Sequence, residues 1–351
     1  MSPQPSSDLL QTPVTLGALR LPNRLIMSPL TRLRADAELA PTKLVAEYYA
    51  QRASAGLIIS EAIAVAPSGD GYPAIPGLFT ARQAEAWRTV VEAVHAQGGR
   101  IAAQLSHNGR ARYATDDAQR AAGWWAVANP LKPHELTPTE LSAMVEAFGQ
   151  GARTARALGF DAVEIHNGNG YLLDQFLRAG ANQRTDAHGG SLENRTRLAL
   201  DIVAAVTEAM GADRVGIRLS PSATVDGAPD PSGEETFAYL LERLAPLGLA
   251  YVHATRTTEQ DRRHGSGPGI PLKRIRALYP GKLIGAGDFS REDGELALAE
   301  GSVDAVAYGR LFIANPDLPE RFARRTALNV PDHATFYTPG PAGFTDYPRL
   351  A

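Results

Sequence analysis

The 351-residue sequence contains no cysteine, which excludes disulfide bonds, thiolate nucleophiles and cysteine metal sites. An excess of either charge is also missing, because 35 Lys and Arg face 38 Asp and Glu, a net charge of -3. We therefore expect no nucleic-acid or anionic-membrane partner. No apolar run could span a bilayer, and the N-terminus lacks the basic and apolar parts of a signal peptide. These absences favour a cytoplasmic protein with a flexible tail over residues 1–10.

Eight short β-like runs alternate with helix-like patterns along the chain. The runs are mostly continuous in apolar residues, which is typical of parallel strands covered on both faces. They span 25–30, 57–65, 100–106, 162–166, 215–220, 249–255, 282–287 and 304–309. The helix-like patterns span 42–55, 81–97, 138–158, 191–209, 234–246, 270–279, 291–300 and 316–326. This alternation, with no change in composition, predicts a single (β/α)8 TIM barrel over residues 11–351, with a lid loop at 110–136 after the third strand.

The barrel prediction gathers the polar residues that follow the strands. Because the carboxyl ends of parallel strands meet on one face, these side chains are expected to converge there. They are Thr31, Glu61, Gln104, His107, His166, Arg218, His253, Asp288, Gly309 and Arg310. The set is rich in donors and poor in carboxylates, so it suits an electron-rich or anionic ring and a phosphate better than a divalent metal. We predict no metal site, since neither H-x-H nor H-E-x-x-H occurs.

Segment 161–178 carries the strongest single group of candidate catalytic residues. A β-like run ends at His166, two glycines follow, and an apolar helix-like stretch begins after Tyr171. His166 and Asn169 can hydrogen-bond an oxygen atom, and Tyr171 is a weak acid. By itself the pattern is weak, because a histidine at a strand end is often bonded into the core and a tyrosine there often packs. A serine hydrolase is excluded by the absence of G-x-S-x-G.

Two further features need a partner or a ligand. Arg218 lies in the fifth β-like run, where a buried guanidinium without a partner would cost several kcal/mol. Its partner is either a structural carboxylate such as Glu164 or a cofactor that becomes anionic. Gly285-Ala-Gly287 and Gly309-Arg310 follow the seventh and eighth runs, where TIM barrels bind phosphate. Turn glycines would explain each of these pairs equally well.

A series of motifs runs in order from about residue 12 to 348. It comprises Ser28-Pro29-Leu30-Thr31, Ser60-Glu-Ala62, Gln104-Leu, His166-x-x-Asn169-Gly-Tyr171, Asn182-x-Arg-Thr-Asp, Gly189-Gly-Ser-x-Glu-Asn-Arg195, Arg218-Leu-Ser, Tyr308-Gly-Arg310 and Thr345-Asp-Tyr-Pro348. The series resembles the old yellow enzymes, which are FMN-dependent ene-reductases on a (β/α)8 barrel. The resemblance implies non-covalently bound FMN, NADPH or NADH as reductant, a small electron-poor alkene as substrate, and a monomer or homodimer.

The resemblance also implies roles for individual residues. Thr31 would hydrogen-bond the flavin C4 carbonyl, Arg218 would lie beside N1 and the C2 carbonyl, and His166 with Asn169 would polarise the substrate. Tyr171 would then protonate the α-carbon of the alkene. The remaining contacts would be Ser28, Pro29, Leu30, Ala62 and Gln104 to the flavin, Gly287, Gly309 and Arg310 to its phosphate, and Tyr72, Ser106 and Tyr337 to the substrate.

The chain departs from the family pattern in three places. Ser106 stands where a tryptophan is usual, which should enlarge the pocket, and the lid at 110–136 is shorter than usual. Gly168 stands where alanine is common, which should loosen the turn slightly. Thr31 and the lack of cysteine place the chain with members that have no thiol near the flavin.

Rival functions remain at this stage. The same site could reduce nitrate esters or nitro compounds, or carry out a flavin-dependent dehydrogenation. A flavin-free phosphate-binding lyase or isomerase would need a catalytic lysine or a carboxylate pair, and neither is found at the strand ends. A non-catalytic barrel that binds flavin or a partner protein would not need His166, Asn169 and Tyr171 together.

Overall fold

A closed barrel of eight parallel strands forms the centre of the computed structural model, which describes residues 8–69, 71–111, 135–221, 232–259 and 269–350. The strands are β3 (Leu25–Met27), β4 (Leu57–Ala64), β5 (Ile101–Ser106), β6 (Ala162–Asn167), β7 (Val215–Leu219), β8 (Tyr251–Thr255), β9 (Leu283–Ala286) and β10 (Ala305–Tyr308). Each pairs with its neighbour in sequence, and β10 pairs with β3 to close the barrel. The predicted (β/α)8 fold and all eight predicted strands are confirmed.

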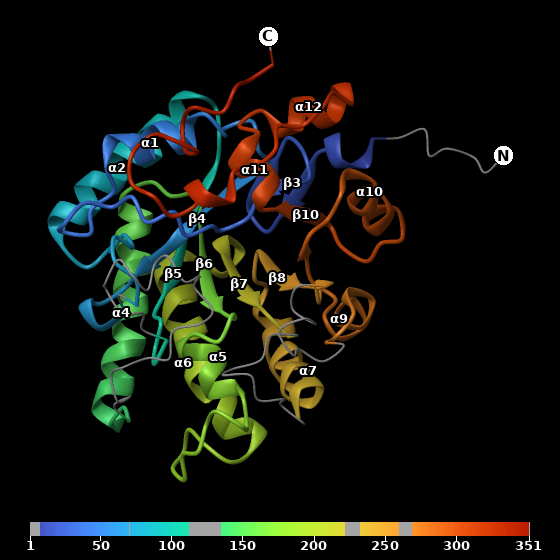
Figure 1. The fold of residues 1–351 in the computed structure, drawn as a ribbon. Coiled ribbons are helices and arrows are strands. Elements are labelled where there is room, and N and C mark those ends of the chain that lie inside the picture. The colour runs from blue at the N-terminus through green and yellow to red at the C-terminus, as the bar shows by residue number, and fades with distance from the viewer. Residues whose placement is uncertain (1–7, 70, 112–134, 222–231, 260–268, 351) are drawn as a thin grey trace.

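Helices surround the barrel (Figure 1). They are α1 (Lys43–Ala50), α2 (Ala81–Ala96), α4 (Pro138–Ala157), α5 (Leu172–Leu177), α6 (Leu192–Met210), α7 (Gly233–Leu244), α9 (Leu272–Leu278), α10 (Arg291–Ala299), α11 (Arg310–Ala314) and α12 (Leu318–Arg324). Short 3₁₀ helices lie at Leu9–Gln11, Pro67–Gly69, Ala212–Arg214, Ala245–Leu247 and His333–Thr335. The start of α4 is fixed by a capping box between Thr137 and Glu140 with Pro138 in the first turn. In the described part of the chain, every helix is too short or too polar to cross a membrane.

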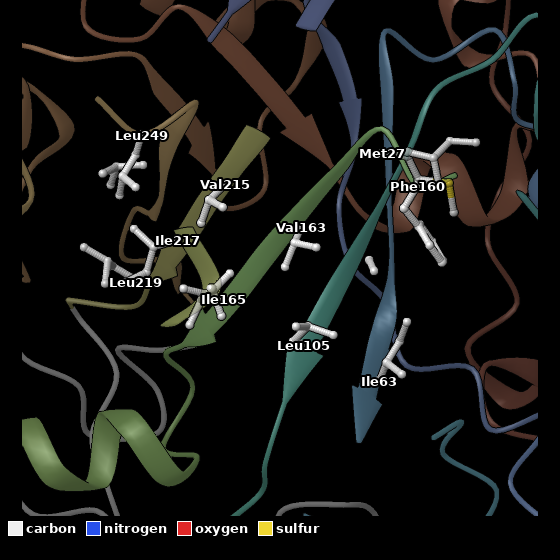
Figure 2. Packing of buried hydrophobic residues seen from close by; sticks show 14 of the residues in the cluster. Met27, Ile63, Leu105, Phe160, Val163, Ile165, Val215, Ile217, Leu219 and Leu249 are labelled. Carbon is white, nitrogen blue, oxygen red and sulfur yellow. The ribbon is translucent and has the colours of Figure 1, made fainter. Parts of the chain in front are cut away.

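Two separate apolar clusters explain why the strands read as continuous apolar runs. Outward-facing residues of the strands, such as Leu105, Val163 and Ile217 of β5, β6 and β7 (Figure 2), belong to one apolar cluster with residues of the surrounding helices. Inward-facing residues form a second cluster inside the barrel, with small side chains such as Ala102 and Ala162. Each large aliphatic side chain that is fully buried contributes roughly 1.5–3 kcal/mol to folding. Most of the strand surface is therefore used for packing, and polar side chains inside the barrel stand out.

A β-hairpin that the sequence did not predict fills one end of the barrel. Strands β1 (Val14–Leu16) and β2 (Leu19–Leu21) pair in antiparallel fashion and alternate buried and exposed residues. Their apolar residues belong to the same cluster as Ile26 and Leu57 inside the barrel. Gly17 has φ 56°, and a Cβ there would lie 2.1 Å from the Asp213 carbonyl oxygen, so the turn requires glycine. Strands of three residues are too short to give a periodic signal.

The folded part of the chain begins at Leu9, two residues before the start at residue 11 that the sequence predicted. Leu9–Gln11 forms a 3₁₀ helix, and Leu10 is completely buried. The backbone N–H groups of Leu9 and Leu10 donate to the Glu295 carboxylate of α10, at 2.9 and 3.1 Å. Leu10 is part of the packed core, so the expected tail over residues 1–10 is wrong for residues 9 and 10. Residues 1–7 lie outside the described residues.

Candidate active site

The register of β5 to β8 arranges residues, most of them polar, in two layers inside the barrel. Gln104, Glu164, Gly216 and Tyr251 are register partners on successive strands and form the lower layer. His166, Arg218 and His253 are partners two residues further along and form the upper layer. Because residues i and i+2 of a strand face the same side, both layers face the barrel interior. The upper layer is nearer the carboxyl ends, where the sequence predicted the site.

His166 is placed in the upper layer as a neutral hydrogen-bond donor. Its side chain is almost fully buried, and its Nδ1 has no hydrogen-bond partner among the described residues. Burial lowers the pKa of His166 well below its ordinary value, and the charge of Arg218 and the nearby His253 add to this shift. The imidazole therefore carries no charge at neutral pH. It can donate one hydrogen bond, but it is a poor source of a proton.

Asn169 lies three residues later, with its amide already oriented. Its backbone is left-handed, with φ 57°, which asparagine tolerates better than most residues. The Ser220 hydroxyl donates to Asn169 Oδ1 at 2.7 Å, so the amide N–H groups are turned the other way. A Cβ on Gly168 would lie 2.5 Å from Ser220 Oγ. Gly168 therefore permits this close approach, and the expectation that it merely loosens the turn is replaced by a packing reason.

Tyr171 stands at the start of α5 and contacts a second tyrosine. Its hydroxyl oxygen lies 2.6 Å from that of Tyr72, and the rings meet edge to face. The His166 ring lies 5.1 Å from the Tyr171 ring, also edge to face. Asp174 fixes the turn below, because it accepts the Gly170 N–H and forms a buried ion pair with Arg178. The structure thus brings together the predicted catalytic residues and Tyr72, a predicted substrate contact.

Arg218 does not have the structural partner that the sequence allowed. The two carboxylate oxygens of Glu164 are occupied by Gln104 Nε2 at 2.7 Å and His253 Nδ1 at 2.9 Å. Arg218 forms no ion pair with the residues described, and its buried Nε has no hydrogen-bond partner among them. Burial lowers the pKa of Arg218, and Glu164 opposes the shift from a distance. A guanidinium left in this state fits the electron-rich edge of a flavin ring.

Residues Ser28 to Thr31, which follow the first barrel strand β3 and are called the first-strand motif, lie next to the end of the last strand, β10. The Ser28 N–H donates to the Tyr308 carbonyl oxygen at 3.0 Å. Leu30 Cδ2 is 3.3 Å from where a Cβ on Gly309 would stand. Ser28 and Pro29 are buried, whereas Leu30 and Thr31 are half-buried and carry the accessible part of the motif.

A β-bulge in β4 positions Ala62 beside Gln104. The register between β4 and β5 shifts between Ile59 and Ala62, after which Ala62 pairs with Gln104. The Ser60 hydroxyl inside the bulge accepts the Gln104 N–H at 3.0 Å, so the backbone group is satisfied. Bulges commonly re-aim side chains near active sites. Here the bulge also turns the Glu61 carboxylate toward the first-strand motif, where Oε2 accepts the Arg32 N–H at 3.1 Å.

Glu61 should make the stability of the protein depend on pH. Burial raises the pKa of Glu61 from 4.5 to about 7, although Arg32 and the Arg34 charge lower it. An acid with a raised folded-state pKa contributes stability below pH 4.5 and loses it as pH rises to about 7. This loss is about 3 kcal/mol for a shift of this size. The free energy of unfolding of Glu61→Gln, measured in urea, should therefore rise relative to that of the parent between pH 4.5 and about 7. Free energies of unfolding that run parallel for the two proteins over this interval would contradict the raised pKa of Glu61.

Two buried arginines, which sequence reasoning missed, hold the segment that carries Tyr337. Arg32 donates to the carbonyls of Phe336 and Gly343, at 3.0 and 2.8 Å. Arg34 donates to the carbonyls of Thr335, Phe336, Gly340 and Ala342. Tyr337 itself is 41% exposed, so it borders solvent. The only signal was a pair of arginines directly after Thr31, and arginine is more often found at the surface.

Ser106 ends β5 on the same interior face as Gln104. Its side chain is buried, and its hydroxyl has no hydrogen-bond partner within the described ranges. The lid expected at 110–136 lies almost wholly outside the described residues, since 112–134 are not described. The enlarged pocket and the short lid therefore stay predictions.

The predicted phosphate residues lie at the ends of β9 and β10, which are neighbours in the barrel. Gly287 has φ 113°, which requires glycine, and Arg256 clamps its carbonyl at 2.6 Å. Gly309 precedes α11, and Arg310 forms an ion pair with Asp288. A Cβ on Gly285 would lie 2.7 Å from Val303, so close packing by itself accounts for glycine at this position, and its part in phosphate binding stays a prediction.

Arg310 is expected to distinguish FMN from riboflavin. If Arg310 binds the phosphate as the sequence predicts, Arg310→Ala should raise the Kd for FMN roughly tenfold to a hundredfold, because one charge-assisted hydrogen bond would be lost. The Kd for riboflavin, which lacks the phosphate, should not change. Asp288→Asn is the matched control: it removes the ion pair with Arg310 and should bind FMN at least as tightly as the parent. Flavin fluorescence titration measures the Kd values of the parent and the two variants. An equal loss of affinity for FMN and for riboflavin in Arg310→Ala would contradict a role of Arg310 in phosphate binding.

No cluster of three or more His, Asp or Glu suited to a metal ion occurs within the described ranges. The side chains at the carboxyl ends of the strands, called the barrel mouth below, are instead donors around the Arg218 guanidinium, which forms no ion pair with a described residue. Such a set can hold an electron-rich ring, polarise an oxygen atom and supply a proton from a tyrosine.

Comparison with known proteins identifies the family. The model of the NADH:flavin oxidoreductase / NADH oxidase family matches residues 9–329. The 12-oxophytodienoate reductase 2 of Arabidopsis thaliana is 39% identical, over 97% of this chain and 96% of the relative. Morphinone reductase has a similar structure, with a TM-score of 0.89, 42% identity, and coverage of 97% of this chain and 96% of that one. For the old yellow enzyme homologue of Zymomonas mobilis the TM-score is 0.88 at 37% identity, with coverage of 97% and 99%.

Proposed function

Because this chain belongs to the NADH:flavin oxidoreductase / NADH oxidase family, and within it to the old yellow enzymes, we propose that it reduces the C=C bond of electron-poor alkenes. FMN is its cofactor and a nicotinamide its reductant. When bound, FMN supplies the hydride chemistry, taking a hydride from NADH or NADPH and giving it to an enone, enal, maleimide or nitroalkene. The side chains of the barrel mouth supply the remaining steps.

The observation that carries the proposal is the pair of preorganised hydrogen-bond donors, His166 and Asn169, at the end of β6. His166 is neutral with a buried ring, and the Asn169 amide is turned by Ser220. Both can donate to a carbonyl or nitro oxygen. That oxygen gains negative charge as hydride reaches the β-carbon, so the two bonds strengthen toward the transition state.

A separate proton donor is required because His166 carries no spare proton. Tyr171 follows on the same turn, with its hydroxyl 2.6 Å from that of Tyr72. We assign Tyr171 as the acid that protonates the α-carbon, and the Tyr72 hydroxyl as a donor that stabilises the tyrosinate left behind. The proton and the hydride together account for the two hydrogens added to the alkene.

The cofactor contacts are assigned from the same geometry. Arg218 lies in the upper layer and forms no ion pair with the residues that the structure describes, so we propose that it faces the pyrimidine edge of FMN, with Gln104 and Ala62 along that edge. Thr31 is the half-buried end of the first-strand motif and is proposed to bond the C4 carbonyl. Gly287, Gly309 and Arg310 are proposed to bind the phosphate.

A spectroscopic experiment tests the proposal directly. The purified protein should be yellow, lose its flavin absorbance when NADPH is added without oxygen, and regain it when 2-cyclohexenone is added. A matched sample with saturated cyclohexanone should stay bleached. If the enone also failed to restore the colour, alkene reduction would be ruled out while flavin binding stood.

Location and assembly complete the proposal. We propose that the reaction takes place in the cytoplasm on a monomer or homodimer, as the sequence indicated. Cell fractionation and light scattering after size exclusion measure these two properties, and recovery in a membrane fraction would contradict the first.

A further inference from the structure

A buried carboxylate that touches none of the proposed reacting groups lies beneath the barrel mouth. Glu164 in the lower layer is completely buried, and so is its neighbour His253, while Gln104 is 1% exposed. A carboxylate in such a place needs hydrogen bonds to both oxygens. Glu164 has them, from Gln104 Nε2 at 2.7 Å and from His253 Nδ1 at 2.9 Å.

The bond to Glu164 decides which way the Gln104 amide points. A carboxylate only accepts, so Gln104 must present its N–H side to Glu164 and its carbonyl oxygen elsewhere. The backbone of Gln104 is fixed as well, since its N–H donates to Ser60 Oγ. Neither the backbone nor the amide of Gln104 is therefore able to turn over without breaking a buried hydrogen bond.

The other neighbours of Glu164 keep it in place without sharing its charge. Burial lowers the pKa of His253, so its ring is neutral and Nδ1–H is the group that donates to Glu164. Burial, and next the Glu164 charge, raise the pKa of Tyr251 well above its ordinary value, so its hydroxyl also stays neutral. A Cβ on Gly216 would lie 2.2 Å from the Tyr251 ring, so this glycine makes room for the tyrosine.

Arg218 is the positive charge that faces this group, one layer higher. It forms no ion pair with Glu164 or with another residue in the described ranges. The negative charge of Glu164 therefore affects a ligand bound next to Arg218 only through long-range electrostatics. The Arg218 guanidinium stays available to hydrogen-bond that ligand.

We propose that Glu164 is a positioning residue for FMN, which holds Gln104 with its amide carbonyl toward the ring edge and places a fixed negative charge beneath the cofactor. The inference rests on the placement of FMN given under the proposed function. A flavin presents an N–H flanked by two carbonyls along its pyrimidine edge. A glutamine with its carbonyl and one N–H left over matches that pattern, whereas a flipped amide does not.

A double-mutant cycle tests the positioning role. Glu164→Gln can accept or donate, so it no longer fixes the amide, and the Kd for FMN should rise about tenfold. Gln104→Ala should give a similar rise, and the double variant should be no worse than either single one, because both changes remove the same contact. An unchanged Kd in Glu164→Gln, or losses that multiply in the double variant, would overturn the proposal.

The midpoint potential of bound FMN gives an independent readout. Reduction adds negative charge to the flavin, so loss of the Glu164 charge should shift the potential of Glu164→Gln to a more positive value. A role limited to packing would change the melting temperature and leave the potential where it was. FMN affinity and potential do not depend on which alkene is reduced, so failure of the proposed reaction would leave both results intact.

A swapped variant guards against misfolding of Glu164→Gln. In Gln104→Glu with Glu164→Gln the pair keeps one amide, one carboxylate and the same net charge, so it should fold with the parent's circular dichroism. The carboxylate now stands nearer the ring edge, so FMN should bind more than tenfold more weakly and its potential should become more negative. Affinity and potential equal to those of the parent would show that the direction of this hydrogen bond is irrelevant.

Discussion

Replacing His166 and Asn169 together by alanine should lower the rate of enone reduction on the order of 10⁴-fold while FMN stays bound. Removal of one prepared oxyanion donor typically costs about 10²–10³-fold, and here both donors are removed. Neither side chain belongs to the set that we assign to FMN. His166 carries no charge, so its loss leaves the charge around Arg218 unchanged.

The measurement is the reoxidation of chemically reduced protein by 2-cyclohexenone in a stopped-flow instrument. Chemical reduction removes any effect of the variant on NADPH binding. Ser220→Ala is the matched control, because it removes only the 2.7 Å bond that orients Asn169 and should cost about tenfold. A reoxidation rate of the double variant within tenfold of the parent's would show that the two residues take no part in the reaction.

Tyr171→Phe should lower enone reduction by about 10²–10⁴-fold, the usual contribution of a general acid. The effect should depend on the substrate. An enone needs the proton to complete its reduction, whereas hydride addition to a nitroalkene gives a nitronate that persists in water. The variant should therefore still consume nitroalkenes and accumulate the nitronate, which can be followed by its absorbance.

Tyr72→Phe provides the comparison for Tyr171. It retains the ring contact but removes the hydroxyl that lies 2.6 Å from the Tyr171 hydroxyl. We expect a loss of about tenfold, since one hydrogen bond to the acid is removed and the acid itself remains. If Tyr72→Phe lost as much as Tyr171→Phe, Tyr72 would itself be the proton donor.

The strands and most helices could be predicted because their signals are local. The apolar runs of β3 to β10 and the capping box of α4 depend on neighbouring residues only. The convergence of His166, Arg218 and Gln104 followed from topology, since parallel strands end on one face. The β1–β2 hairpin and the burial of Leu10 depend on contacts with distant parts of the chain, and short segments carry no period to reveal them.

The hydrogen-bond partners of the site residues could not be predicted from residue types. Glu164 was the natural ion-pair partner for Arg218 on the sequence, but its oxygens go to Gln104 and His253. Likewise nothing local indicates that Ser220, the residue after β7, orients Asn169. Which of several possible partners a buried polar group takes is decided by register and by the space that glycines such as Gly168 leave.

The contacts of Arg32 and Arg34 with the C-terminal segment link the order in which the chain is synthesised to the stage at which it can bind its cofactor. Arg32 and Arg34 leave the ribosome early, but the carbonyls that they bind lie at 335–343. The barrel also closes only when β10 pairs with β3. Contacts this distant in sequence form late, so Arg32 and Arg34 lack their carbonyl partners at 335–343 until almost the whole polypeptide has been made. A nascent chain halted before residue 335 should therefore hold FMN poorly even with every proposed flavin contact already synthesised.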